Sequence, residues 1–188
     1  MTTWRTFCAV ELPAEVREQL QQHIVSLRKQ VPEPPASWSR VENIHLTLKF
    51  FGNVELDRIP MISAAATRTT EQFSKFEIQV GNTGVFPRPS RAQVLWIGVS
   101  DPSGQLSALQ KQFEAECAAA GFEKEDRAYH PHLTIARLRK PDRQLADTHL
   151  NLNFPSVAVR VHELVFFRSE PSSKGSRYTP ISHHPLPG

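Results

Sequence analysis

A four-residue pattern of histidine, an apolar residue, threonine and a second apolar residue occurs twice in this chain of 188 residues. The two copies are His45-Leu46-Thr47-Leu48 and His132-Leu133-Thr134-Ile135. In an extended strand, residues i and i+2 lie on the same face. Each copy therefore predicts a strand with an imidazole and a hydroxyl on one face and apolar residues in a core. Either copy alone is equally consistent with a histidine at a strand edge, whereas the pair predicts two strands that line one site.

Two histidines and two threonines in one site suit the cleavage of a phosphodiester near neutral pH. One imidazole takes a proton from the attacking group, and the other gives a proton to the leaving oxygen. Hydroxyl groups donate to the nonbridging phosphoryl oxygens. We expect His45 and His132 to be catalytic, and Thr47 and Thr134 to bind the phosphate. We also expect His132 to activate water and His45 to protonate the leaving oxygen, but the local sequence leaves the reverse assignment open.

Charge and cysteine content set weak limits on partners and compartment. The formal net charge of +3 and the pI near 9.1 favour an anionic partner only mildly. Cys8 and Cys117 form no C-x-x-C motif, so the sequence predicts reduced thiols rather than a disulfide or a zinc ribbon. No apolar run approaches the length of a membrane span or a signal-peptide core. We therefore expect a cytoplasmic protein without a membrane partner.

Strand and helix patterns alternate along the chain, without a low-complexity segment or a long linker. The predicted strands cover residues 7–12, 37–41, 44–50, 76–80, 94–99, 132–138, 157–167 and 178–181, and the predicted helices cover residues 13–27, 56–72 and 106–117. Residues 86–91 and 137–143 are expected to be basic surface loops. The order predicts an α+β fold of two pseudo-symmetric lobes across a central cleft, each lobe an antiparallel sheet backed by helices. Residues 1–188 would form this single bilobal domain.

Both motifs, together with their flanking segments, resemble the two-histidine (2H) phosphoesterase superfamily. More narrowly, the chain resembles the bacterial and archaeal RNA 2′,3′-cyclic phosphodiesterases, also called LigT-like proteins or 2′–5′ RNA ligases. The segments that carry the resemblance are residues 6–13 (TFCAVELP), 43–52 (NIHLTLKFFG), 94–99 (VLWIGV), 131–137 (PHLTIAR), 167–169 (FRS) and 177–178 (RY).

The resemblance implies a bilobal fold and hydrolysis of RNA 2′,3′-cyclic phosphate ends to 2′-phosphomonoesters, without a metal or other cofactor. It also implies a reversible 2′–5′ joining activity, which is the same chemistry run backwards. The family's second motif implies that Arg137 binds the phosphate. Strand parity opposes this role, because Arg137 is five residues from His132 and should point to the opposite face unless the strand bends.

Several residues are weaker candidates for contacts with the substrate. Lys49 has the parity of His45 and Thr47 and is a candidate for the pocket rim. Phe7 and Phe51 are candidates for stacking on the terminal base, and Tyr178 is a candidate from the closing strand. For each of these residues, packing or solvation is the competing interpretation. Five basic residues in two loops are candidates for flanking the RNA backbone: Arg88, Arg91, Arg139, Lys140 and Arg143.

Three other functions stay open at this point. A metal hydrolase could use the H-x-H of His130 and His132 or the adjacent His183 and His184, although no carboxylate stands at helpful spacing. An RNA-end or nucleotide-binding module would keep the pocket without turnover. A phosphodiesterase for 2′–5′ linkages or small cyclic phosphates would use the same motifs. The expected partner is RNA with 2′,3′-cyclic phosphate ends, such as tRNA fragments, and a monomer would suffice because both motifs lie in one chain.

Overall fold

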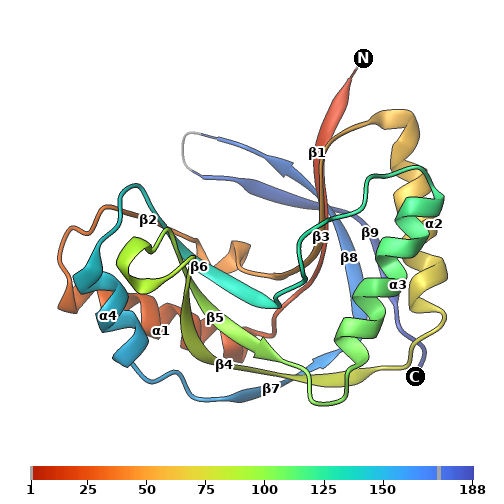
Figure 1. Cartoon of the computed structure of the whole chain (residues 1–188). Helices are drawn as coiled ribbons and strands as arrows, with labels where there is room; N and C mark the ends of the chain where they lie inside the picture. Colours follow the sequence, from red (N-terminus) through yellow and green to blue (C-terminus); the bar gives the residue numbers. More distant parts are fainter. Residues whose placement is uncertain (1, 173–174) are drawn as a thin grey trace.

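Two antiparallel β-sheets form the framework of the protein in a computed structural model that describes residues 2–172 and 175–188 (Figure 1). One sheet has four strands in the order β3-β1-β8-β9, and the other has five strands in the order β2-β6-β5-β4-β7. The strands are β1 (Thr3–Val10), β2 (Ala36–Trp38), β3 (Leu46–Glu55), β4 (Phe76–Phe86), β5 (Val94–Ser100), β6 (His132–Leu138), β7 (Val157–Val161), β8 (Glu163–Glu170) and β9 (Arg177–Pro185).

The α-helices begin where the sequence supplies a suitable first turn. They are α1 (Ala14–Gln30), α2 (Ile59–Thr70), α3 (Gln105–Ala119) and α4 (Arg143–Asn151), and the short 3₁₀ helices are η1 (Val41–Asn43), η2 (Leu56–Arg58) and η3 (Pro89–Arg91). Pro13 precedes α1, and Pro60 lies in the first turn of α2, where a missing N–H costs no hydrogen bond. Helix α4 lies partly in the segment expected to be a basic loop. The Asp142 side chain caps it by accepting a hydrogen bond from the Leu145 N–H at 2.9 Å.

The helices do not stay with the strands that precede them. Helix α1 follows β1 of the four-stranded sheet but packs beside α4, which contacts β4 of the five-stranded sheet. Helix α3 follows β5 of the five-stranded sheet but packs on α2 and β3. Each lobe therefore combines segments from both halves of the chain. All four helices contribute to one continuous cluster of buried residues, which includes Leu20, Ile62, Phe113 and Leu145.

The strand expected over residues 157–167 is two strands in different sheets. Strand β7 pairs with β4 at one edge of the five-stranded sheet, and β8 pairs with β1 in the four-stranded sheet. The chain changes sheets at His162, the single residue between them. Strand β9 then pairs with β8 and closes the four-stranded sheet, as expected for residues 178–181.

Each sheet has one face covered by helices and one helix-free face. Helices α2 and α3 lie outside the four-stranded sheet, and α1 and α4 lie outside the five-stranded sheet, so both helix-free faces look toward the middle of the molecule (Figure 1). The two motif strands contact each other there: the Tyr129 hydroxyl, just before β6, donates to the Thr47 carbonyl of β3 at 3.2 Å. No helix in the described part of the chain is both long and apolar enough to cross a membrane.

Candidate active site

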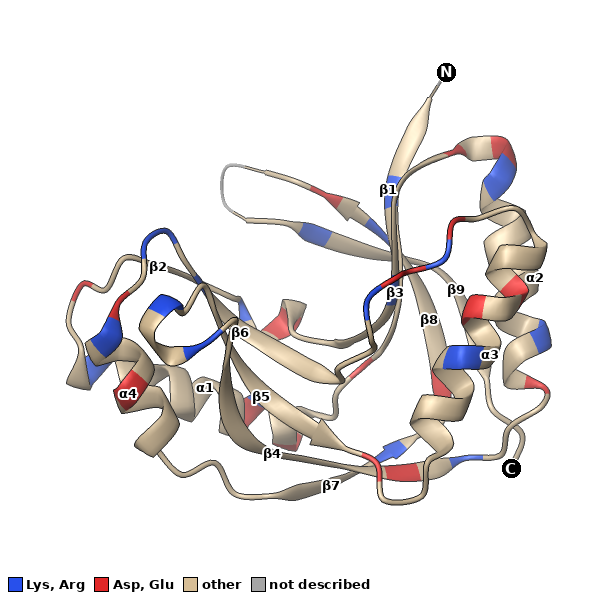
Figure 2. Cartoon of the chain, in the orientation of Figure 1, with Lys and Arg blue, Asp and Glu red and all other residues tan. Residues whose placement is uncertain are grey.

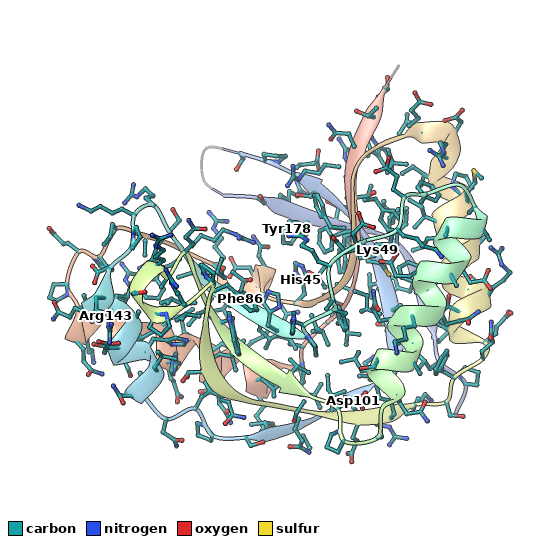
Figure 3. All side chains as sticks on the ribbon, viewed as in Figure 1. His45, Lys49, Phe86, Asp101, Arg143 and Tyr178 are labelled. Atoms are coloured by element: carbon teal, nitrogen blue, oxygen red, sulfur yellow. The ribbon has the colours of Figure 1, made fainter. Side chains whose placement is uncertain are left out.

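His45 lies immediately before β3, on the helix-free face of the four-stranded sheet. Its ring stacks on Phe7 of β1, with centroids 4.5 Å apart, and meets the edge of Tyr178 of β9 at 5.3 Å. Phe7 in turn stacks on Phe167 of β8 at 5.1 Å. Figure 3 shows His45 and Tyr178 between the two sheets. Three strands thus hold this imidazole in an aromatic setting.

His132 opens β6 on the helix-free face of the five-stranded sheet. The ring of Phe86, at the end of β4, meets it edge-on at 5.1 Å, and Trp96 of β5 lies 6.4 Å away. Thr134 lies directly opposite Trp96, on the same face as His132. Its carbonyl accepts a hydrogen bond from the Ser39 hydroxyl at 2.9 Å, which fixes the backbone of the motif.

Both histidines are held in the same tautomer by the same local contact. Nδ1 of His45 lies 2.8 Å from the Asn43 carbonyl, and Nδ1 of His132 lies 2.6 Å from the His130 carbonyl. Because a carbonyl only accepts, Nδ1 must carry the proton in each ring. Each neutral imidazole therefore keeps Nε2 as its free, basic nitrogen. The two motifs present chemically equivalent nitrogens for proton transfer.

Burial keeps both imidazoles neutral at physiological pH. It lowers the pKa of His45 to about 4, against the opposing effect of the Asn43 carbonyl and with a smaller contribution from the charge of Arg17. Burial also lowers the pKa of His132, and the charge of Arg137 adds to this effect. The lowered pKa values mean that either ring can start as a base. A ring that acts as an acid must gain its proton in the presence of substrate.

A β-bulge interrupts the pairing at the same place in both motifs. In β3, Thr47 pairs with Ala9 and Lys49 with Cys8, so Leu48 is the extra residue. In β6, Thr134 pairs with Trp96 and Ala136 with Leu95, so Ile135 is the extra residue. A bulge shifts the alternation of faces by one residue. The fifth residue after each histidine therefore returns to the helix-free face.

The bulge brings Arg137 to the phosphate side of β6 and removes the parity objection. Arg137 pairs with Val94, which shares the helix-free face with Trp96. Its side chain is exposed, and its charge acts on His132. The structure thus places His132, Thr134 and Arg137 on one face of one strand.

The bulges in β3 also turn Lys49 and Phe51 away from the site, which contradicts their expected roles. Lys49 is turned to the helix-covered face, where it forms a buried ion pair with Glu114 of α3 at 2.7 Å and donates to the Glu123 carbonyl. Figure 3 shows it beside α3, away from His45. A second bulge makes Phe51 the extra residue opposite β1. Its ring packs in the core against Phe113 and Phe122. Neither residue lies at the site.

Phe7 and Tyr178 are placed beside His45, but with different exposure. Phe7 is buried under His45 and Phe167, so its faces are already occupied and it supports the catalytic ring. Tyr178 is half-buried and keeps part of its ring open. The structure therefore places Tyr178, rather than Phe7, where a substrate group has access.

Two site residues that the sequence motifs do not indicate are Phe86 and Trp96, which are half-buried and lie next to His132. Their rings are 5.1 Å apart. The indole of Trp96 lies so close to Gly84 of β4 that a Cβ there would meet a ring carbon at 2.0 Å. A glycine inside a strand opposite a tryptophan is the sequence signal that could have indicated this close approach.

Basic residues border the five-stranded side of the site, with one exception among the candidates. Figure 2 shows Lys and Arg on the turn between β4 and β5 and on the turn after β6. Arg88, Arg91, Arg139 and Lys140 are exposed there. Arg143 instead lies on the outer side with α4, where it pairs with Asp147 at 2.6 Å (Figure 3). It does not flank the site.

The histidines of the metal hypothesis are not brought together. The His130 carbonyl orients His132, whereas His183 pairs with Glu163 at 3.1 Å and His184 contacts the Thr67 hydroxyl of α2. Within residues 2–172 and 175–188, no three His, Cys, Asp or Glu side chains are grouped to hold a metal ion.

Two interleaved lobes with a His-x-Thr strand on each inner face define a two-histidine phosphoesterase. The chain belongs to the 2′-5′ RNA ligase superfamily, whose family model matches residues 12–172. It is 35% identical over 180 residues to an RNA 2′,3′-cyclic phosphodiesterase of Methanothermobacter thermautotrophicus, covering 93% of this chain and 95% of that protein. It is 30% identical to the Thermotoga maritima protein of the same name, covering 93% of this chain and 91% of the other. The crystal structure of Escherichia coli LigT in apo form superposes over 100% of both chains, with a TM-score of 0.75 and 26% identity.

Proposed function

We propose that the protein hydrolyses RNA 2′,3′-cyclic phosphate ends to 2′-phosphomonoesters with His45 and His132 as the acid–base pair. The observation that carries the proposal is the duplicated geometry, in which each bulged motif strand presents a histidine Nε2 and a threonine on one inner face. The relatives named RNA 2′,3′-cyclic phosphodiesterase support the reaction. A solved complex of the related Escherichia coli LigT with 3′-AMP supports a nucleotide-binding site in this fold.

Hydrolysis requires in-line attack of water on phosphorus, with O3′ leaving on the opposite side. We infer that His132 takes the proton of the attacking water and that His45 protonates O3′. Thr47, Thr134 and Arg137 bind the nonbridging oxygens, where donors aimed at developing charge stabilise the transition state. The half-buried rings of Phe86, Trp96 and Tyr178 offer apolar surface for the terminal nucleoside.

The same chemistry run backwards would join an RNA 5′-OH to the cyclic phosphate, and we include 2′–5′ ligation in the proposal. Fragments of tRNA with cyclic ends are suitable substrates. Both motifs lie in one chain, so a monomer is sufficient. Cys8 and Cys117 are free and buried, which supports the proposal of a cytoplasmic protein.

The test is hydrolysis of an oligoribonucleotide with a 2′,3′-cyclic phosphate end, in EDTA, by the wild-type protein and by His45→Ala and His132→Ala. We expect a 2′-phosphate product, and a loss of about 10²–10⁴ in rate for each variant. Product from both variants at the wild-type rate would contradict the two-histidine mechanism. Binding without turnover by the wild-type protein would identify a binding module instead.

A second substrate assigns the acid. A nucleotide phosphodiester with a nitrophenolate leaving group needs no proton on that group. We expect it to restore turnover to His45→Ala but not to His132→Ala. Rescue of His132→Ala alone would reverse the two roles.

A further inference from the structure

Phe50 of β3 is an exposed aromatic residue close to the first motif. It is 49% exposed, the most open large hydrophobic side chain among the described residues. It pairs with Phe7 across β3 and β1 and therefore shares the helix-free face with the Phe7–His45 stack. Because both motifs contain the same bulge, Phe50 is the counterpart in the first motif of Arg137 in the second.

The cation that this motif lacks comes from the neighbouring strand. The guanidinium of Arg5 lies over the Phe50 ring, 4.6 Å from its centroid. Arg5 is two residues from Phe7 on β1, so it points to the same face. Its side chain is exposed, and it forms no ion pair with any residue that the structure describes. The ring holds the guanidinium in place while leaving its positive charge available to an anion.

We propose that Arg5, oriented by Phe50, binds the phosphate that joins the terminal nucleotide to the preceding one. This subsite deepens the proposed function and rests on it. An RNA that ends in a 2′,3′-cyclic phosphate extends only on its 5′ side, so any contact beyond the terminal nucleoside must be on that side. Two residues along a strand span about 6.6–6.8 Å, which places Arg5 one nucleotide step from the Phe7–His45 stack. The subsite makes the enzyme prefer a polymer end over a free nucleoside cyclic phosphate.

Substrates of increasing length isolate this contact. They are a nucleoside 2′,3′-cyclic phosphate, the same nucleoside with an added 5′-phosphate, and a dinucleotide with a cyclic end. Only the last two carry the phosphate assigned to Arg5. For Arg5→Ala we expect KM to rise about 3–10-fold on these two substrates. On the nucleoside cyclic phosphate, we expect less than a twofold change in kcat/KM.

Salt dependence gives a second readout. Losing one contact to a phosphate in a single strand should reduce the slope of log KM against log salt by about 0.7 for the dinucleotide. Arg5→Lys should retain this slope because the charge remains. Phe50→Leu should also retain the slope, but it should raise KM on the two phosphate-bearing substrates by less than Arg5→Ala does, because the guanidinium keeps its charge and loses only the ring that orients it.

Arg168 provides a matched control on the opposite face of the same sheet. Its guanidinium lies over the Trp4 ring at the same 4.6 Å, but Trp4 is on the helix-covered side of β1. Arg168→Ala should leave all three substrates unchanged. Equal KM changes on all substrates for Arg5→Ala, or none on any, would overturn the subsite. A penalty confined to the dinucleotide would overturn the phosphate contact. Failure of the wild-type protein on every substrate would instead refute the proposed function.

Discussion

At the scale of single residues, the two catalytic imidazoles share the same tautomer but have different neighbours. Both donate Nδ1–H to the carbonyl two residues before them, and both keep Nε2 free. His45 is enclosed by Phe7 and Tyr178, whereas His132 has Phe86 at its edge and Arg137 nearby. Burial lowers the pKa of both, and the pKa of His45 falls to about 4. The free protein therefore holds two neutral imidazoles at pH 7, although catalysis requires one protonated acid.

This charge state predicts different pH profiles for kcat/KM and kcat. The catalytic acid loses its proton as the pH rises through its pKa, which lies below 6.5 in the free protein for either histidine. Since kcat/KM reports the free enzyme, it should fall as the pH rises above about 6.5. A bound phosphodiester anion favours the protonated form of a nearby imidazole. The alkaline limb of kcat should therefore lie at higher pH than that of kcat/KM, and coincident alkaline limbs above pH 7 would contradict the lowered pKa values.

At the scale of secondary-structure elements, the sequence predicts correctly which side chains share a face before each bulge, but not after it. Period-two alternation correctly places Thr47 with His45 and Thr134 with His132, because no bulge lies between them. One residue further, alternation fails, since a bulge depends on the pairing of two strands and leaves no mark in the pattern of one. It assigns Lys49 to the site and opposes Arg137, and both assignments are wrong for the same reason.

The placement of Lys49 predicts a role in stability rather than catalysis. Lys49→Met would leave the Glu114 carboxylate buried without its partner, at a cost of about 3–5 kcal/mol in the free energy of unfolding. Adding Glu114→Gln should recover most of this loss, because the remaining groups are neutral. Urea denaturation measures both changes in the free energy of unfolding. KM should stay at its wild-type value in the Lys49→Met, Glu114→Gln double variant, which should remain folded.

A neighbouring ion pair serves as the control. Arg68 of α2 contacts Glu116 of α3 at the same distance of 2.7 Å, but the Arg68 side chain is 49% exposed. Arg68→Met should cost only about 0–1 kcal/mol. If Lys49→Met were equally mild and raised KM instead, Lys49 would belong to the site after all.

At the scale of the whole molecule, the two sheets exchange helices, which periodicity along the chain cannot reveal. Periodic apolar residues predict that α1 and α3 exist and which side of each is buried, but not which sheet each helix covers. The short α4 begins within a basic segment whose composition favours a loop, and the Asp142 cap is the one local signal for its start. The exchange ties both halves into one core. A consequence is that residues from distant parts of the sequence support the back of the site.

A buried histidine pair makes this support sensitive to acid. Nε2 of His149 on α4 lies 3.2 and 3.1 Å from the carbonyls of Gly84 and Trp96, so it must carry the proton. Nδ1 of His149 then accepts from Nε2 of His23 on α1 at 3.0 Å. This chain of hydrogen bonds requires His149 to be neutral, because its Nδ1 accepts the hydrogen bond from His23. It links helices from the two halves to β4 and β5, and β5 carries the Trp96 ring of the site.

Burial and the neighbouring His149 lower the pKa of His23 to about 4. Between pH 6.5 and 4 the unfolded chain binds a proton at this residue and the folded protein does not. Stability is therefore full above pH 6.5 and falls as the pH drops toward 4. We expect His23→Gln, which keeps an amide donor for His149, to reduce the loss of unfolding free energy between pH 7 and 4 by about 3 kcal/mol. His45, His132, His149 and His184 also have lowered pKa values, so part of the acid sensitivity should remain. Urea denaturation across this pH range measures the difference, and parallel curves for the variant and the wild-type protein would show that His23 is protonated in the folded state without cost.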